Sequence, residues 1–302
     1  MSTLLLCLAL LLGGNWLWTP DKDRASLEAV YARAEDGSRF IELDGVRLHV
    51  RDSAPGAPPG TPTLLMLHGF GSSLHTWQAW AEALSPPWRV LRVDLPGAGL
   101  TGADPSGDYS DARALQLIGA LLDERGIARV TVIGHSMGGR LAWRLAAEQP
   151  QRVDKLVLIA PVGLEPGPAP EVPAGARLLR RVLPRAVLQA GLESAWGDTR
   201  RLTADTVTRY HDLLLAPQVR DAILQRAHQP PAQDAPTQLP RVCAATLLLW
   251  GERDRLIPPA RAQDLQRLLP HARVVELPGL GHVPQEEAPA QSLPALQAFL
   301  AE

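Results

Sequence analysis

A strand, a sharp turn and a helix follow one another directly at residues 130–140, Val-Thr-Val-Ile-Gly-His-Ser-Met-Gly-Gly-Arg. Residues with a preference for β-structure end at Ile133, and a helical pattern begins immediately after Ser136. A G-x-S-x-G turn between such elements strains the backbone at the serine and exposes its Oγ above the edge of the sheet. Glycine is needed at positions 134 and 138 because a side chain there would collide with the neighbouring strand or helix. Ser136 is therefore the predicted nucleophile.

Short apolar segments of the kind that are buried in parallel sheets alternate with helical patterns along much of the chain. A hairpin of two alternating strands, 40–43 and 46–50, joined by Asp44-Gly45, precedes them. The predicted strands are 63–67, 89–93, 130–133, 156–159, 246–250 and 273–277, and the predicted helices are 74–84, 111–125, 137–148, 259–268 and 288–300. This pattern predicts an α/β fold with a mainly parallel eight-stranded sheet and helices on both faces.

One long interval interrupts this alternation, because no strand-like segment occurs between Ala160 and Cys243. Helical patterns occupy 176–189, 204–215 and 217–227 within it. A loop of roughly 80 residues without secondary structure would be unusual inside a compact domain. We therefore predict a helical lid at 165–240, inserted after the sixth strand, and a core domain formed by 39–164 and 241–302.

Two loops at the carboxyl ends of predicted strands supply an acid and a base. Asp254 follows the seventh strand, where a carboxylate can accept a hydrogen bond from a histidine Nδ1–H and fix its tautomer. Glu252 is a nearby rival for this role, and Glu165 is a further candidate. His282 follows the eighth strand between flexible glycines, and its Nε2 could take the proton of Ser136. The carboxyl ends of the strands are the edge where open α/β sheets place their sites.

A third loop, His68-Gly-Phe-Gly71, follows the first parallel strand. Its glycines permit a tight turn in which backbone N–H groups point inward. The N–H groups of Phe70 and Met137 are the predicted oxyanion-hole donors, because two fixed donors must face the oxygen that becomes negative. The alternative is that this tetrapeptide is an ordinary turn after a strand.

Composition argues against several other classes of protein. The chain has 302 residues, 46% of them hydrophobic, and a net charge of −2, and no basic block with interleaved aromatic residues suggests nucleic-acid binding. Cys7 and Cys243 are the only two cysteines, and no histidine–carboxylate set has metal-ligand spacing. We predict no cofactor and no metal, and the oligomeric state cannot be derived from the sequence.

The N-terminus is apolar from residue 4 to residue 18. This run lacks the basic region and the cleavage site of a secretory signal, and tryptophans at 16 and 18 are typical of a membrane interface. We predict that 1–19 is a membrane segment, followed by a connector at 20–38. A cleaved signal, or a helix docked on the domain, is the alternative. Basic residues only after the run weakly favour a cytoplasmic catalytic domain.

With these residues in view, the sequence resembles the α/β-hydrolase fold superfamily. The matching motifs are His68-Gly-Phe-Gly, Asp94-Leu-Pro-Gly-Ala-Gly-Leu-Thr, Gly134-His-Ser-Met-Gly-Gly, Trp250-Gly-Glu-Arg-Asp and Gly281-His. The N-terminus looks like that of bacterial members with a membrane segment, which implies anchoring at the inner membrane. Ala98 departs from the family pattern, which often has histidine there.

The resemblance implies hydrolysis of esters or related acyl bonds of small lipophilic molecules through an acyl-enzyme. A serine nucleophile argues against the relatives that dehalogenate or open epoxides with an aspartate. Hydrolysis of carbon–carbon bonds in ring-cleavage diketones is the alternative activity, since those relatives use the same three residues and a helical lid. A degenerate hydrolase fold used for binding is the non-enzymatic alternative.

Arginines recur at helical spacing in the predicted lid, at 177, 181 and 185, with apolar residues on the other side. Such a helix could rest on an anionic membrane surface and admit lipophilic substrates. The alternative is a solvated charged face on an ordinary lid helix, and Pro184 interrupts the pattern.

Overall fold

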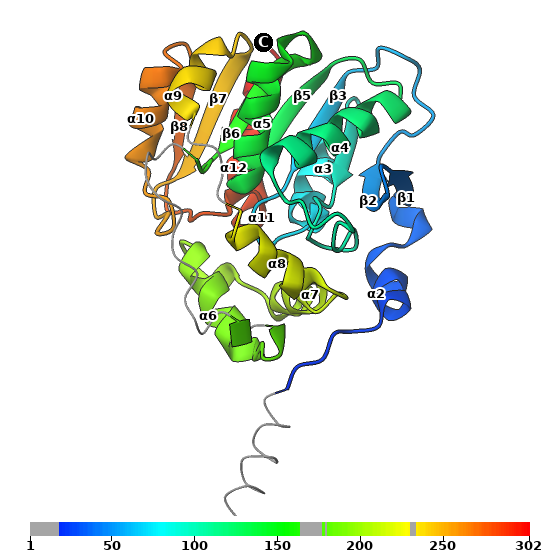
Figure 1. Ribbon diagram of the computed structural model, residues 1–302. Helices are drawn as coiled ribbons and strands as arrows, with labels where there is room; N and C mark the ends of the chain where they lie inside the picture. The colour runs from blue at the N-terminus through cyan, green and yellow to red at the C-terminus, as the bar shows by residue number, and fades with distance from the viewer. Residues whose placement is uncertain (1–17, 164–176, 179, 230–233) are drawn as a thin grey trace, which may run out of the picture.

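The computed structural model describes residues 18–163, 177–178, 180–229 and 234–302. Its sheet has eight strands in the order β1-β2-β4-β3-β5-β6-β7-β8 (Figure 1). β2 is antiparallel to both β1 and β4, and all other neighbours are parallel. The predicted fold class, a mainly parallel eight-stranded sheet with helices, is confirmed.

The strands agree closely with the apolar segments of the sequence. They are β1 Ser38–Leu43, β2 Val46–Asp52, β3 Thr63–Leu67, β4 Arg89–Val93, β5 Val130–His135, β6 Val153–Ile159, β7 Ala245–Gly251 and β8 Arg273–Leu277. Asp44 and Gly45 connect β1 to β2 with φ of 48° and 80°, the positive values that a tight hairpin turn requires. β3, β4 and β5 are buried at every position, which is why their sequences lack polar alternation.

The helices divide into those that cover the sheet and those that lie beyond its carboxyl edge. The covering α-helices are α3 Gln78–Leu84, α4 Asp111–Glu124, α5 Met137–Glu148, α9 Ala235–Gln238, α10 Arg261–Leu268, α11 Pro284–Glu287 and α12 Pro289–Leu300. The others are α2 Arg24–Tyr31, α6 Arg185–Ala195, α7 Ala204–Leu214 and α8 Val219–Ala227. Short 3₁₀ helices occupy Ala34–Asp36, Leu74–Trp77, Pro150–Arg152, Thr199–Arg201 and Leu239–Arg241.

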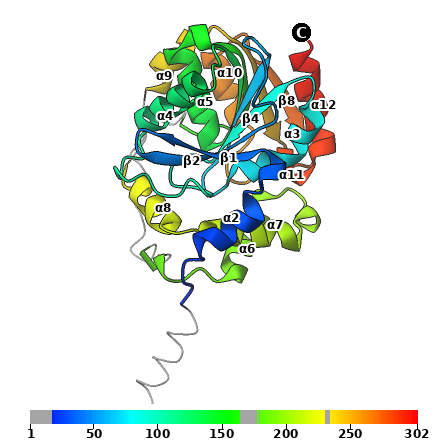
Figure 2. The same cartoon turned by 90° about the vertical axis from the view of Figure 1, so that its right-hand side faces the viewer.

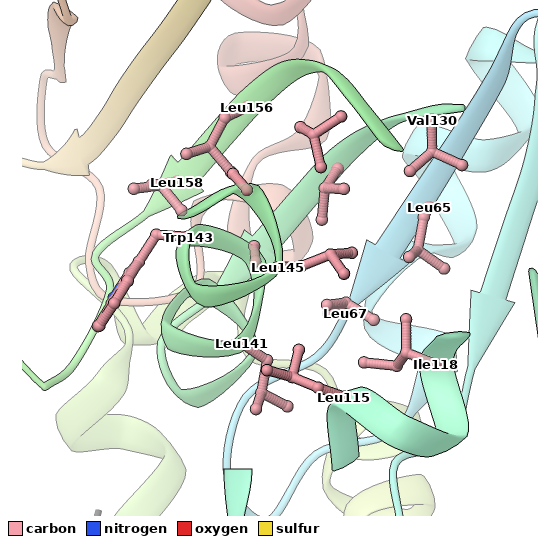
Figure 3. Close-up of a cluster of buried hydrophobic side chains, with 14 of the residues drawn as sticks. Leu65, Leu67, Leu115, Ile118, Val130, Leu141, Trp143, Leu145, Leu156 and Leu158 are labelled. Carbon is pink, nitrogen blue, oxygen red and sulfur yellow. The ribbon is translucent and has the colours of Figure 1, made fainter. Parts of the chain in front are cut away.

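Two apolar layers hold the sheet between its helices. α4, α5 and α10 pack on one face, where leucines of β3 and β6 meet Leu141 and Leu145 of α5 and Ile118 of α4 (Figure 3). α3 and α12 cover the other face through Trp80 and Leu296. Complete burial of such a leucine contributes roughly 1.5–3 kcal/mol. These two layers hold the sheet in place, and with it the carboxyl ends of the strands, where the site lies.

The lid lies beyond the carboxyl edge of the sheet and contains α6, α7 and α8 (Figure 1). The prediction of a helix over 176–189 is confirmed among the described residues only at 185–189, because α6 begins at Arg185 and continues to Ala195. Pro184 is extended, with φ −61° and ψ 133°, and the residue before a proline is disfavoured in helical conformation. Arginines 177, 181 and 185 therefore do not share the face of one helix.

Residues 18–36 contact both the lid and the core. The N–H of Thr19 donates to the carbonyl of Arg181 (2.8 Å), and the N–H of Lys22 donates to the carbonyl of Leu215 (2.7 Å). Leu27 of α2 is buried against residues of the lid and of the loop that follows β4. Figure 2 shows α2 beside the lid helices. The segment predicted as a connector is thus packed against the rest of the molecule over these residues.

The predicted membrane segment lies outside the described residues except for its last positions. Among the residues that the structure describes, none of the helices has the length and apolar character needed to cross a bilayer.

Candidate active site

Ser136 stands at the turn between β5 and α5 with φ 53° and ψ −115°. A positive φ costs a residue with a side chain roughly 1–3 kcal/mol and persists only where the surroundings hold it. The N–H of Ser136 donates to the carbonyl of Ile159 (2.9 Å), and the N–H of Val162 donates to the carbonyl of Ser136 (3.2 Å). The strand β6 and the loop after it therefore hold the strained turn.

The glycines on either side of this turn have no room for a side chain. A Cβ on Gly134 would lie 2.3 Å from the carbonyl oxygen of Gly138, and one on Gly138 would lie 2.2 Å from that of Leu67. Real Cβ atoms do not approach backbone atoms so closely, so any substitution requires the backbone to move. The turn therefore packs directly against the end of β3.

His282 and Asp254 face each other at the neighbouring end of the sheet. The Nδ1 of His282 is 2.7 Å from the Oδ2 of Asp254, and both side chains are buried. The other carboxylate oxygen, Oδ1, accepts the N–H groups of Leu256 and Ile257, each at 2.9 Å. These bonds fix the carboxylate, which in turn fixes a tautomer of His282 with its proton on Nδ1 and a free lone pair on Nε2.

The two rival acids do not share this position. Glu252 is exposed and its Oε2 accepts the N–H of Gly279 (2.7 Å), so it supports the loop before His282 and leaves the imidazole to Asp254. Glu165 lies outside the described residues.

His135 fixes the position of the loop that carries His282. Burial, followed by the proximity of His282, lowers the pKa of His135 well below its ordinary value. The neutral ring donates from Nε2 to the carbonyl oxygen of His282 (2.8 Å). The two rings lie 4.7 Å apart between centroids, and the N–H of His282 donates to the carbonyl of Ala195 in the lid (2.7 Å). His135 thus orients the backbone at His282.

The loop that carries Phe70 approaches the turn at Ser136. A Cβ on Gly69 would lie 2.8 Å from the Nδ1 of His135 and 3.2 Å from the Cβ of Ser136. His68 fixes the loop, because its Nε2 accepts the N–H of Leu95 (2.9 Å) and its Nδ1–H donates to the carbonyl of Gly69 (2.8 Å). Burial lowers the pKa of His68, which keeps this neutral tautomer.

The N–H groups of Phe70 and Met137 donate to no acceptor among the described residues. Met137 is the first residue of α5, so its N–H is one of those that the helix itself leaves unbonded. Two such groups near Ser136 form an arrangement that would stabilise an oxyanion.

A cavity of about 530 Å³ connects these residues with the lid. Its lining residues are Phe70, Gly71, Ser72, His135, Ser136, Val162, Leu183, Leu188, Gly191, Leu192, Ala195, Trp196, Tyr210, Leu214, Arg220, Ile223, Leu256, Ile257, His282 and Val283. Aliphatic and aromatic side chains predominate, and the volume lies in the range typical of small-molecule sites, about 300–1,000 Å³.

Two acidic residues after His282 have roles that the sequence does not reveal. Glu287 is buried and accepts the N–H groups of Gly281 (2.8 Å), Gly197 (3.0 Å) and Asp198 (2.8 Å), which joins the histidine loop to the lid. Glu286 forms an ion pair with Arg209 and accepts the hydroxyl of Tyr210 (3.0 Å). The available sequence signal is an acidic pair within a short helical segment, and such pairs are common on protein surfaces.

Metal ligation finds no support in the part of the chain that the structure describes, where no three His, Cys, Asp or Glu side chains are arranged to hold an ion.

Comparison with known proteins agrees with the observed fold. A family model described as alpha/beta hydrolase fold matches residues 62–289. The chain is 33% identical over 280 residues to a 2-hydroxy-6-oxononadienedioate/2-hydroxy-6-oxononatrienedioate hydrolase of Cupriavidus pinatubonensis, covering 85% of this chain and 93% of the relative. It is 31% identical over 281 residues to the dihydrolipoyllysine-residue acetyltransferase component of the acetoin cleaving system of Cupriavidus necator, covering 89% and 69%. A crystal structure of a membrane phospholipase A, described as a bacterial virulence factor, is similar with a TM-score of 0.72 and 27% identity, covering 100% and 98%.

Proposed function

The chain belongs to the α/β-hydrolase fold family, and from this premise we propose that it is a serine hydrolase that cleaves carboxylic esters of small lipophilic substrates. It is a hydrolase of the α/β fold; the ester specificity and the roles of single residues are the proposal. The observation that carries it is the buried Asp254–His282 pair beside a strained serine, at the end of an apolar cavity.

Acylation begins when the Oγ of Ser136 attacks the ester carbonyl carbon while the Nε2 of His282 takes the hydroxyl proton. The carbonyl oxygen becomes an oxyanion and accepts the N–H groups of Phe70 and Met137. Asp254 stabilises the imidazolium that forms, since its carboxylate is 2.7 Å from Nδ1. The intermediate then collapses, the carbon–oxygen bond to the alcohol breaks, and His282 gives its proton to the departing alkoxide.

Deacylation repeats these steps with water as the nucleophile. His282 takes a proton from the water as it attacks the acyl carbon, and the same two N–H groups hold the second oxyanion. Collapse releases the carboxylic acid, and the proton returns through His282 to the Oγ of Ser136. Removal of either donor typically costs about 3 kcal/mol of transition-state stabilisation.

The lining of the cavity supports an ester with a lipophilic acyl chain. Leucine, isoleucine, valine and tryptophan side chains surround Ser136, and a chain of methylene groups is stabilised by about 0.8 kcal/mol for each group that it buries there. Arg220 is the one lysine or arginine among the lining residues, and it pairs with Asp21.

Carbon–carbon hydrolysis of ring-cleavage products is the second candidate, favoured by the 33% identity to the Cupriavidus pinatubonensis hydrolase. The substrate in that relative's name is a dioate, which carries two carboxylates. A cavity with a single arginine, itself paired, supports the ester in preference to a dianion.

A panel of p-nitrophenyl esters of increasing chain length, assayed beside a ring-cleavage dienedioate, tests this proposal. We expect kcat/KM for the esters to rise with acyl length and to exceed that for the dienedioate. Faster turnover of the dienedioate would contradict the ester proposal and support carbon–carbon hydrolysis as the function.

Covalent labelling tests the nucleophile separately from the substrate. A fluorophosphonate probe should label the wild type and leave Ser136→Ala unlabelled. Equal labelling of both would reject Ser136, and an unlabelled wild type would favour a degenerate binding protein.

We also propose that residues 4–18 anchor the chain at the membrane, in keeping with an exposed Trp18 whose side chain is next to Arg181. Fractionation of cells that express the full chain or residues 20–302 tests this. Recovery of the full chain in the soluble fraction would reject the anchor.

A further inference from the structure

A second cavity, of about 400 Å³, lies beside the first. It is formed by residues 18–21, by Arg177, Arg180 and Arg181 before α6, and by the start of α8. Its lining residues are Trp18, Thr19, Pro20, Asp21, Arg177, Arg180, Arg181, Arg220 and Asp221. We call it the arginine cleft.

Positive charge exceeds negative charge in the arginine cleft, because four arginines face two aspartates. Arg180 forms an ion pair with Asp221, and Arg220 forms one with Asp21. Arg177 and Arg181 are exposed and form no ion pair with a carboxylate of the described residues; the guanidinium of Arg181 lies 4.6 Å from the ring of Trp18. Two guanidinium groups are therefore available to an anionic ligand.

The hydrogen bonds of Asp21 indicate what kind of ligand group the cleft can bind. Its Oδ1 accepts the Nη2 of Arg220 (2.7 Å), and its Oδ2 accepts the N–H of Gln218 (3.2 Å) at the start of α8. Donors from a side chain and from the backbone thus converge on a carboxylate that lines the cleft. An added anion would meet Arg177 and Arg181 nearer the surface.

The arginine cleft shares a wall with the cavity at Ser136. Arg220, whose side chain is only 6% exposed, lines both cavities. Leu183 lines the first cavity, and its N–H donates to the Oγ1 of Thr19, which lines the second (3.0 Å). One molecule could therefore place an acyl chain in the first cavity and a charged group in the second.

We propose that the arginine cleft binds the phosphate group of a glycerophospholipid ester whose acyl chain enters the cavity at Ser136. This inference rests on the proposed ester hydrolysis. Guanidinium groups match the oxygens of a phosphate in pairs, and such charge-assisted bonds are stronger than neutral ones. Leu178, 67% exposed, and Trp18, 48% exposed, adjoin the arginines and would contact the apolar part of the lipid.

The test compares kcat/KM for three short-chain esters with matched acyl groups, supplied as monomers to the full chain in nonionic detergent. Dihexanoylphosphatidylglycerol and dihexanoylphosphatidylcholine carry the phosphate, and dihexanoylglycerol does not. We expect the wild type to prefer the two phosphate esters by about tenfold, mainly through KM, since two charge contacts are involved.

Substitution should remove this preference. Arg177→Gln combined with Arg181→Gln should abolish most of it, whereas lysine at both positions should retain a large part, because the charge persists. Arg267→Gln, on the exposed side of α10, removes one positive charge elsewhere and should leave the preference intact. Absence of the preference in the wild type, or its persistence in the glutamine pair, would overturn the proposal.

Binding to the Ser136→Ala chain separates the cleft from catalysis. Calorimetry should detect dihexanoylphosphatidylglycerol, with affinity reduced by the glutamine pair, even if no ester is cleaved; failure of cleavage alone would then overturn the proposed function and leave the cleft supported. Millimolar inorganic phosphate should compete poorly. Competition as strong as that of the lipid would identify a site for a free anion and overturn the headgroup assignment.

Discussion

Replacement of Asp254 by asparagine should abolish turnover while it leaves the fold nearly unchanged. The asparagine oxygen can take the place of Oδ1 and accept the N–H groups of Leu256 and Ile257, now at 2.9 Å. Its amide nitrogen then stands where Oδ2 lies, 2.7 Å from the Nδ1 of His282. An amide donates at that point, so the histidine must accept on Nδ1 and carry its proton on Nε2.

The size of the effect follows from this change of tautomer. With a proton on Nε2, His282 cannot take the proton of Ser136, and a change of this kind costs about 10⁴ in kcat, or about 5.5 kcal/mol in activation free energy. Stability should fall by only about 1–2 kcal/mol, because the shape of the side chain is retained and a charge-assisted hydrogen bond is lost.

Hydrolysis of p-nitrophenyl butyrate measures the loss, and urea unfolding measures the stability. Glu252→Gln is the matched control, since it changes the rival carboxylate, and its kcat should stay within about twofold of the wild type. A wild-type rate in Asp254→Asn, or a large loss in Glu252→Gln, would refute the assignment of the acid.

Three further predictions concern stability. Gly138→Ala should destabilise the fold by more than ~2 kcal/mol and reduce labelling of Ser136 by the fluorophosphonate probe, because the new Cβ would lie 2.2 Å from a backbone oxygen. Gly119→Ala is the control: position 119 of α4 has open space around it, so this variant should stabilise the protein by about 0.5–1 kcal/mol. Burial lowers the pKa of His75 to about 3. Below about pH 6.5 the unfolded chain binds a proton at this histidine that the folded chain does not bind. The free energy of unfolding should therefore fall by about 2 kcal/mol between pH 7 and pH 5 because of His75. His75→Gln should remove this part of the pH dependence. Glu287→Ala should cost about 3 kcal/mol, since three N–H groups, two of them buried, lose their acceptor.

Urea unfolding at the stated pH values checks each of these predictions. Equal stability of the two glycine variants would contradict the steric argument at Ser136. A pH dependence in His75→Gln equal to that of the wild type would show that His75 titrates alike in both states. A neutral Glu287→Ala would mean that water satisfies the three N–H groups.

Much of the fold could be predicted because its signals are local. Strands buried on both faces are short apolar segments, and the hairpin at Asp44 needs positive φ at adjacent residues, so each can be identified without knowledge of its partners. The order of Ser136, Asp254 and His282 along the chain could also be identified, because each follows a strand and parallel strands end at one edge. Their roles in catalysis stay a prediction until they are tested.

Other features arise only when distant segments meet. Glu287 binds Gly197, 90 positions away, and the arginine cleft joins residues 18–21 to Arg220 across about 200 positions. The start of α6 was misplaced because apolar periodicity outweighed Pro184, whose fixed φ and restriction of the preceding residue end the pattern. Local sequence thus determined the strands, the turn at Ser136 and the candidate acid and base. Tertiary structure decided which carboxylate meets the histidine and what surrounds the substrate, because hydrogen bonds and cavities depend on distances in space that spacing along the chain does not encode.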